Sequence, residues 1–366
     1  MPILDQGYQH WNGKLAGHAW RWLTITRQGT RAQLKNRWAW YVLVSALLPA
    51  LILSLFLMLW GLFEQKSSFL TPLLFLFQGL PEELRAGPRG FRTEFWTIAF
   101  STFLDMQLFS SMLMVLLVGP ELISQDLRYN AIPLYFARPV RRVDYFVGKL
   151  GVIAVFLGLV TIVPVIMAFV LGYGFSLDPL VIKDTWRVLA GSLGFGIVVV
   201  VSAGTLMLAI TSLSRNARYV GAMWIGVWVV SSVASTVLDQ TIHRDWCPLI
   251  SYTGNLSRIR EALLDSPAAW AKVNSLFKAG GDQIRDPSVP GAQGGRFRRR
   301  RGFTFSPPPP PPPAPPRSDR TSSVNALGVG KTMTYPWQWS AAVLAGLSAI
   351  SVWVLATRVR SLDRLR

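Results

Sequence analysis

A carboxylate lies near the middle of a long apolar run, where Asp105 is followed two residues later by Gln107. A charged group within a hydrocarbon layer is costly, so this side chain must face protein or water. It is a candidate for a pathway or gating role, and a buried hydrogen bond between helices is the structural alternative. Because the apolar runs carry almost no other ionisable group, a proton-coupled secondary transporter is disfavoured.

The chain lacks the residue patterns of common catalytic and metal sites. It contains neither His-Glu-x-x-His nor Gly-x-Ser-x-Gly, and its single cysteine, Cys247, excludes an internal disulfide and a multi-cysteine metal site. Gly328 to Thr332 resembles a phosphate-binding loop, but Asn325 stands where that motif requires glycine. We therefore expect no enzyme activity, metal or cofactor in this chain, with an enzyme dependent on Asp105 as the competing hypothesis.

The segment Gly119–Lys149 joins two apolar runs and is rich in charge. Pro120 suits the first turn of a helix, in which Glu121 lies near the positive end of the helix dipole and Arg128 near the negative end. Asn130 and Pro133 are expected to end this helix. A short helix with charged ends, held beyond the spans, is suited to docking on a cytoplasmic partner. The charged residues of the segment are Glu121, Asp126, Arg128, Arg138, Arg141, Arg142, Asp144 and Lys149.

The elements around these residues are membrane spans. The chain has 366 residues, of which 51% are hydrophobic and 15% charged, whereas a soluble domain averages about 25% charged residues. The apolar blocks are about 20 residues long, which is the length that crosses a hydrocarbon core. The sequence predicts an all-α membrane protein. Its six spans are expected at about 39–62, 95–118, 150–173, 188–213, 219–238 and 337–356.

The charge of the short loops predicts the orientation. With the N-terminus inside, the inside segments hold about 17 basic and about five acidic residues, whereas the short outside loops hold about six of each. Both termini are therefore expected in the cytoplasm. Most of the net charge of +18 lies in these inside segments, so we do not expect nucleic acid as a partner.

The chain divides into five regions. Residues 1–37 form a basic arm with interleaved Trp, typical of an interfacial amphipathic helix, with a disordered arm as the alternative. Residues 38–238 hold the first five spans and the cytoplasmic loop 119–149. Residues 239–279 form amphipathic helices on the outer membrane surface or capping the bundle. Residues 280–335 are expected to form an Arg/Pro-rich disordered insert, with docking of its proline run to a proline-reading domain as the alternative. Residues 336–366 are expected to form the sixth span and a basic tail.

Three motifs in the charged segment resemble a known family. They are Leu-Ile-Ser-x-Asp-Leu-Arg at 122–128, Leu-Tyr-Phe-Ala-Arg-Pro-Val at 134–140 and Asp-Tyr-Phe-Val-Gly-Lys at 144–149. They are similar to the segment after the second span of type-2 ATP-binding-cassette (ABC) transporter permeases. The resemblance extends over residues 8–275 and 336–366. This chain has Ala131–Leu134 where most members carry Gly-Thr-Leu, and the proline insert is not part of the family pattern.

The resemblance implies a permease subunit of an exporter in a bacterial inner membrane. It implies a second permease copy or paralogue, and a cytoplasmic ATPase subunit that binds the ATP and Mg, so that this chain itself carries no cofactor. The loop helix would couple the ATPase to the spans. The residues implied in coupling are Glu121, Asp126, Arg128, Arg138, Pro139, Arg141, Arg142 and Lys149. The alternative is a membrane anchor or scaffold that recruits partners without transport, in which these charges only set the topology.

Overall fold

The computed structural model describes residues 20–65, 87–132, 135, 141–176, 178–242, 246–285 and 335–363. Within these residues the chain is almost entirely helical and contains no strand, and six helical segments are long and apolar enough to cross a membrane. The protein is therefore an all-α, multi-pass membrane protein, as the sequence predicted. Arg138, Pro139 and most of the Arg/Pro-rich insert lie outside the described residues.

Each predicted span lies within one of the helical segments, and most segments extend beyond the apolar core. The helices are α2 (Arg37–Glu64), α4 (Arg92–Val118), α7 (Arg142–Val160) with α8 (Ile162–Ser176), α9 (Leu180–Leu213), α10 (Ala217–Ile225) with α11 (Ser231–Ile242), and α14 (Trp337–Asp363). A 3-10 turn, η3 (Pro88–Phe91), precedes α4, and a π-helical turn, η4 (Gly226–Val230), joins α10 to α11. Asparagine side chains cap the N-termini of two of the spans. Asn36 accepts a hydrogen bond from the Trp38 amide, and Asn216 accepts one from the Arg218 amide.

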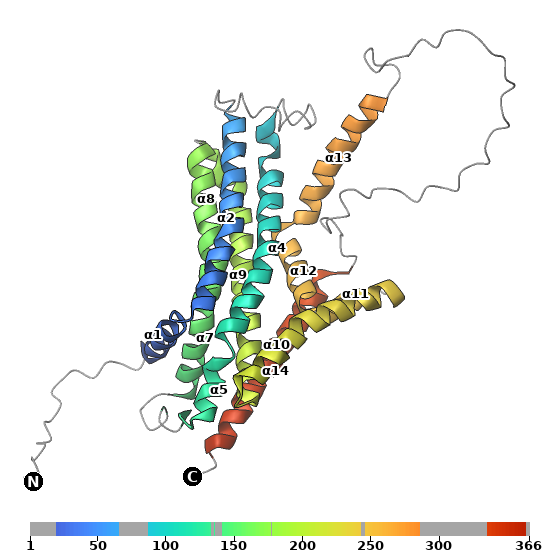
Figure 1. The fold of residues 1–366 in the computed structure, drawn as a ribbon. Coiled ribbons are helices and arrows are strands. Elements are labelled where there is room, and N and C mark those ends of the chain that lie inside the picture. The colour runs from blue at the N-terminus through green and yellow to red at the C-terminus, as the bar shows by residue number, and fades with distance from the viewer. Residues whose placement is uncertain are drawn as a thin grey trace, which may run out of the picture.

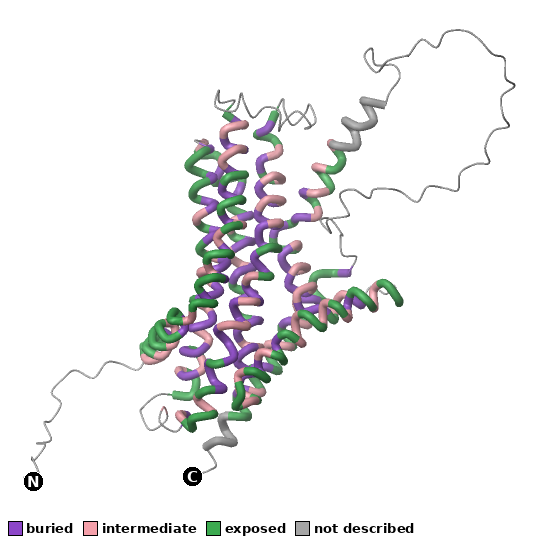
Figure 2. The backbone as a smooth tube through the Cα atoms, viewed as in Figure 1, coloured by how far each residue is buried: buried purple, intermediate pink, exposed green. Residues whose placement is uncertain are grey.

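The helices form a bundle with α9 near its centre. Helix α9 packs against α4, α7, α8, α12 and α14, while α2 packs against α8 and α4. Figure 1 shows α2, α4, α8 and α9 side by side, with α10, α11 and α14 inclined away from them. Buried residues follow the interior of the bundle in Figure 2. The exposed face of α2, by contrast, is apolar through Leu48, Leu51, Leu55 and Phe56, which suits contact with lipid.

Two shorter helices, α12 (Tyr252–Leu264) and α13 (Ser266–Arg285), follow the fifth span. The Tyr252 hydroxyl lies 3.1 Å from Ser202 Oγ on α9, and a Cβ added at Gly191 would lie 2.6 Å from the Leu263 carbonyl oxygen. Helix α12 thus runs along α9 and packs against it. Glycine at residue 191 allows this close approach, because it has no side chain to separate the two backbones.

Candidate functional site

A short helix, α5 (Glu121–Arg128), extends beyond the end of α4. Gly119 and Pro120 join the two helices, and the Leu122 amide donates to the Gly119 carbonyl at 3.0 Å. The helix ends where Asn130 takes a left-handed conformation (φ 50°) and the Ala131 amide donates to the Asp126 carbonyl at 2.8 Å. The predicted helix and its end at Asn130 are confirmed.

The two faces of α5 differ in polarity. Leu122 and Ile123 are buried, with 4% and 2% of their surface exposed, and the helix packs against α9 and α10. Glu121 and Arg128 are exposed at its ends. The apolar face therefore attaches α5 to the bundle, and charged side chains remain exposed at both of its ends.

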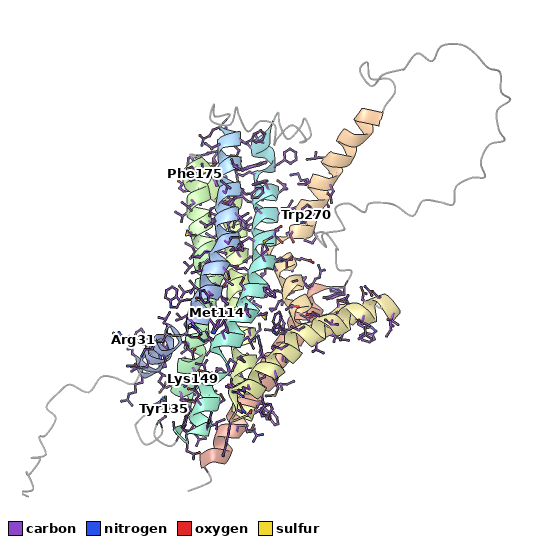
Figure 3. The ribbon with its side chains drawn as sticks, viewed as in Figure 1. Arg31, Met114, Tyr135, Lys149, Phe175 and Trp270 are labelled. Carbon is purple, nitrogen blue, oxygen red and sulfur yellow. The ribbon has the colours of Figure 1, made fainter. Side chains whose placement is uncertain are left out.

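Asp126 binds two residues of α7, and we call Asp126, Tyr145 and Lys149 the Asp126 cluster. Lys149 Nζ lies 2.7 Å from Asp126 Oδ2, and the Tyr145 hydroxyl donates to the same oxygen at 2.6 Å. The Lys149 ammonium also lies over the rings of Tyr145 and Tyr135, 5.5 and 5.8 Å from their centroids. Figure 3 shows Tyr135 and Lys149 together at the α5 end of the bundle. The cluster therefore joins α5 to α7.

Tyr135, in the segment between α5 and α7, packs beside the Asp126 cluster. Burial, and then the negative charge of Asp126, raise the pKa of the Tyr135 phenol above its usual value. The phenol therefore stays neutral at physiological pH. It presents an aromatic face to the Lys149 ammonium rather than a competing negative charge.

The structure separates the predicted coupling residues into two groups. Asp126 and Lys149 are largely enclosed, and their ion pair attaches α5 to α7. The side chains of Glu121, Arg128, Arg141 and Arg142 are exposed. The Arg141 amide donates to Asp144 Oδ2 at 3.2 Å, which caps the start of α7. Sequence reasoning missed Tyr145, although its position one helical turn before Lys149 places both on the same face of α7.

Asp105 pairs with an arginine of α12. Arg260 donates through Nη1 to Asp105 Oδ1 and to the Ser101 carbonyl, the latter at 3.0 Å. The Arg260 side chain is 7% exposed and that of Asp105 is 54% exposed. Asp105 thus joins α4 to α12, and about half of its side chain remains exposed at the surface of the bundle. Arg260 was not predicted as a partner of Asp105, although it lies on the same helical face as the apolar Leu256 and Ile259, where an arginine is unexpected.

Gln107 satisfies the backbone of two neighbouring helices. Its Nε2 donates to the Val160 carbonyl at 2.6 Å and to the Ala46 carbonyl at 2.9 Å. Pro164 has no N–H, so it cannot donate to the carbonyl of Val160 four residues earlier. The fully buried Gln107 provides the missing donor where α7 gives way to α8, and it holds α2, α4 and α7 together.

An ionic cluster occupies the opposite end of the bundle from α5. Arg92 is 2% exposed; its Nη2 lies 2.6 Å from Glu64 Oε2 and 2.9 Å from Asp178 Oδ2, and its Nη1 lies 3.1 Å from Asp184 Oδ2. Trp60 Nε1 donates to Glu64 Oε1 at 2.6 Å. One guanidinium therefore holds the ends of α2 and α9, and the connection between α8 and α9, against α4.

No metal site is found in the part of the chain that the structure describes, where no three His, Cys, Asp or Glu side chains are grouped to hold an ion. The chain matches no family model and no curated protein with which it was compared. The arrangement of α5 and its attachments is thus the strongest indication of function. It provides exposed charges on a helix that is connected to two spans.

Proposed function

We propose that this chain is the membrane-spanning permease subunit of an ATP-driven ABC exporter, and that α5 is its coupling helix. The observation that carries the proposal is the double attachment of α5. It continues from α4 through Gly119 and Pro120, and the Asp126–Lys149 ion pair attaches it to α7. A displacement of α5 by a partner would therefore act on two spans at once.

The chemistry of α5 supports docking to a separate protein. Glu121, Arg128 and Arg141 present exposed charges of both signs that can pair with complementary groups. Arg142 lies beside them at the start of α7. The ATPase, with its ATP and Mg, is that partner. The permease works as a dimer with a second copy or paralogue in the bacterial inner membrane, with both termini in the cytoplasm. The short-loop charge asymmetry and the resemblance to type-2 ABC permeases support these assignments.

A membrane scaffold without transport activity is the second candidate, because an exposed charged helix could also recruit a partner that does no work. The discriminating experiment purifies the tagged chain from its native membrane, identifies co-purifying proteins by mass spectrometry, and measures ATP hydrolysis. An exporter subunit should bring an ATPase with it. A scaffold should bring other proteins and no nucleotide hydrolysis.

Charge reversal at exposed positions tests whether α5 is the docking helix. Arg128→Glu with Arg141→Glu should abolish capture of the ATPase and leave the thermal unfolding temperature close to that of the wild type, since both side chains are exposed. Lys183→Glu with Arg187→Glu, at exposed positions of α9 near the opposite end of the bundle, is the matched control. Undiminished capture by the α5 variant would refute the coupling assignment.

A further inference from the structure

The first helix, α1 (Arg21–Gln33), lies against the part of α7 that carries the Asp126 cluster (Figure 1). Thr26 Oγ1 donates to the Gly148 carbonyl at 2.9 Å. A Cβ added at Gly148 would lie 2.7 Å from Ile25 Cβ, and one added at Gly29 would lie 2.6 Å from Val152 Cγ2. Close packing of backbones therefore seats α1 on α7, at the residue directly before Lys149.

The opposite face of α1 carries a row of basic residues. Arg27 and Arg31 are one helical turn apart and exposed, and the exposed Lys35 continues the row after the helix ends. Within the described part of the chain, none of the three forms an ion pair. The sequence contains no acidic residue from Trp20 to Phe63. The row therefore has no counter-charge in its own helix, and the first acidic residue of the following helix, Glu64, lies at the far end of α2 and pairs with Arg92.

Aromatic residues place this row at the membrane surface. Helix α2 begins at Arg37, and Trp40 Nε1 donates to the Leu34 carbonyl at 2.9 Å, which ties the first turn of the span to the end of α1. The surrounding aromatic side chains are Trp20, Trp38, Trp40 and Tyr41, exposed by 50% to 68%. Exposed Trp and Tyr at the entry of a span are typical of the headgroup layer.

We propose that Arg27, Arg31 and Lys35 form a binding site for anionic lipid headgroups in the leaflet on the α5 side. Guanidinium and ammonium groups at headgroup depth complement phosphate diesters that carry a net negative charge, and zwitterionic headgroups offer no such excess. A bound lipid would hold α1 against α7, where Ile25 packs on Gly148 and Gly29 on Val152. Lipid binding therefore stabilises the turn of α7 from which Lys149 binds Asp126. The lipid site does not rest on the proposed transport function.

The test compares two lipids on the full-length chain reconstituted in phosphatidylcholine bilayers. Electron spin resonance measures the association of spin-labelled phosphatidylglycerol relative to spin-labelled phosphatidylcholine. The wild type should prefer phosphatidylglycerol, and Arg27→Gln with Arg31→Gln should lower the preference by about five-fold per residue, the factor that one basic residue contributes near an anionic surface. About 1 M salt should remove most of the preference, because it screens exposed charges.

Arg215→Gln with Arg218→Gln is the matched control, since it removes the same charge from exposed positions outside α1 and should retain most of the preference. No preference in the wild type overturns the site and assigns the basic row to an acidic protein surface instead. An equal loss of phosphatidylglycerol preference in the two double variants would show a general electrostatic attraction to the protein, and this result also overturns the proposed site.

The link to α5 has its own readout, hydrogen exchange of the amides of 121–128. Phosphatidylglycerol should slow exchange in the wild type and not in the Arg27→Gln/Arg31→Gln variant. Exchange that does not respond to the lipid overturns the link. Neither measurement requires an ATPase, so both are independent of the exporter proposal.

Discussion

Lys149 Nζ lies 2.7 Å from Asp126 Oδ2, and this pair is nearly enclosed, with 10% and 14% of the two side chains exposed. It connects the helix beyond the second span with the first turns of the third. Tyr145 donates to the same carboxylate oxygen, so both groups that bind the oxygen come from α7. The attachment of α5 thus depends on one carboxylate and one face of α7.

Removing one member of the Asp126–Lys149 pair should destabilise the protein strongly. Asp126→Asn leaves a buried ammonium without its counter-charge, and we expect a loss of about 3 kcal/mol in the free energy of unfolding. The double variant Asp126→Asn with Lys149→Met should lose less than the sum of the single losses. Thermal unfolding in detergent measures both. Additive losses would show that the pair contributes no coupling energy.

The contribution of Gln107 to stability should be smaller when Pro164 is replaced. Gln107→Leu leaves the Val160 and Ala46 carbonyls without its hydrogen bonds, at a cost of about 1–3 kcal/mol. Pro164→Ala restores an N–H that can donate to Val160, so it should reduce the cost of Gln107→Leu. Unfolding temperatures of the two single variants and the double variant test this. An equal cost in both backgrounds would contradict the role assigned to Gln107.

Asp105→Asn should be more damaging than Arg260→Leu. The asparagine variant leaves the buried Arg260 without its charged partner, whereas the leucine variant leaves a carboxylate that is half exposed and open to hydration. The difference in unfolding temperature between the two variants tests this order. The reverse order would show that the open side of Asp105 faces lipid, where an unpaired carboxylate is costly.

Acid should weaken the Arg92 cluster through Asp178. The hydrogen bond from Arg92, and then that from the Leu180 amide, lower the pKa of Asp178 below its usual value. Stability from a lowered pKa is present above the unfolded value, about 4, and is lost as the pH falls through the folded value. The unfolding temperature should therefore fall below about pH 4, with a smaller fall in Asp178→Asn. Identical pH profiles would exclude a contribution from this carboxylate.

The sequence by itself determined the spans and the α5 helix. Runs of about 20 apolar residues identify spans because their transfer into lipid depends on composition alone. The bounds of α5 follow from Pro120 and Asn130, since helix starts and ends depend on neighbouring residues. The amphipathic pattern of α12 identified a helix, but its position along α9 was not predicted, because a pattern shows which face is buried and not against what.

The tertiary structure decided which polar groups meet. Asp126, Asp105 and Gln107 were all recognised as important residues, and none of their partners was assigned. Lys149, Arg260 and the Val160 carbonyl lie on other helices, and their pairing depends on the rotation and depth at which those helices pack. In a membrane an unpaired polar group costs several kcal/mol. Such groups must therefore find partners, but only the packing of the helices decides which ones they find.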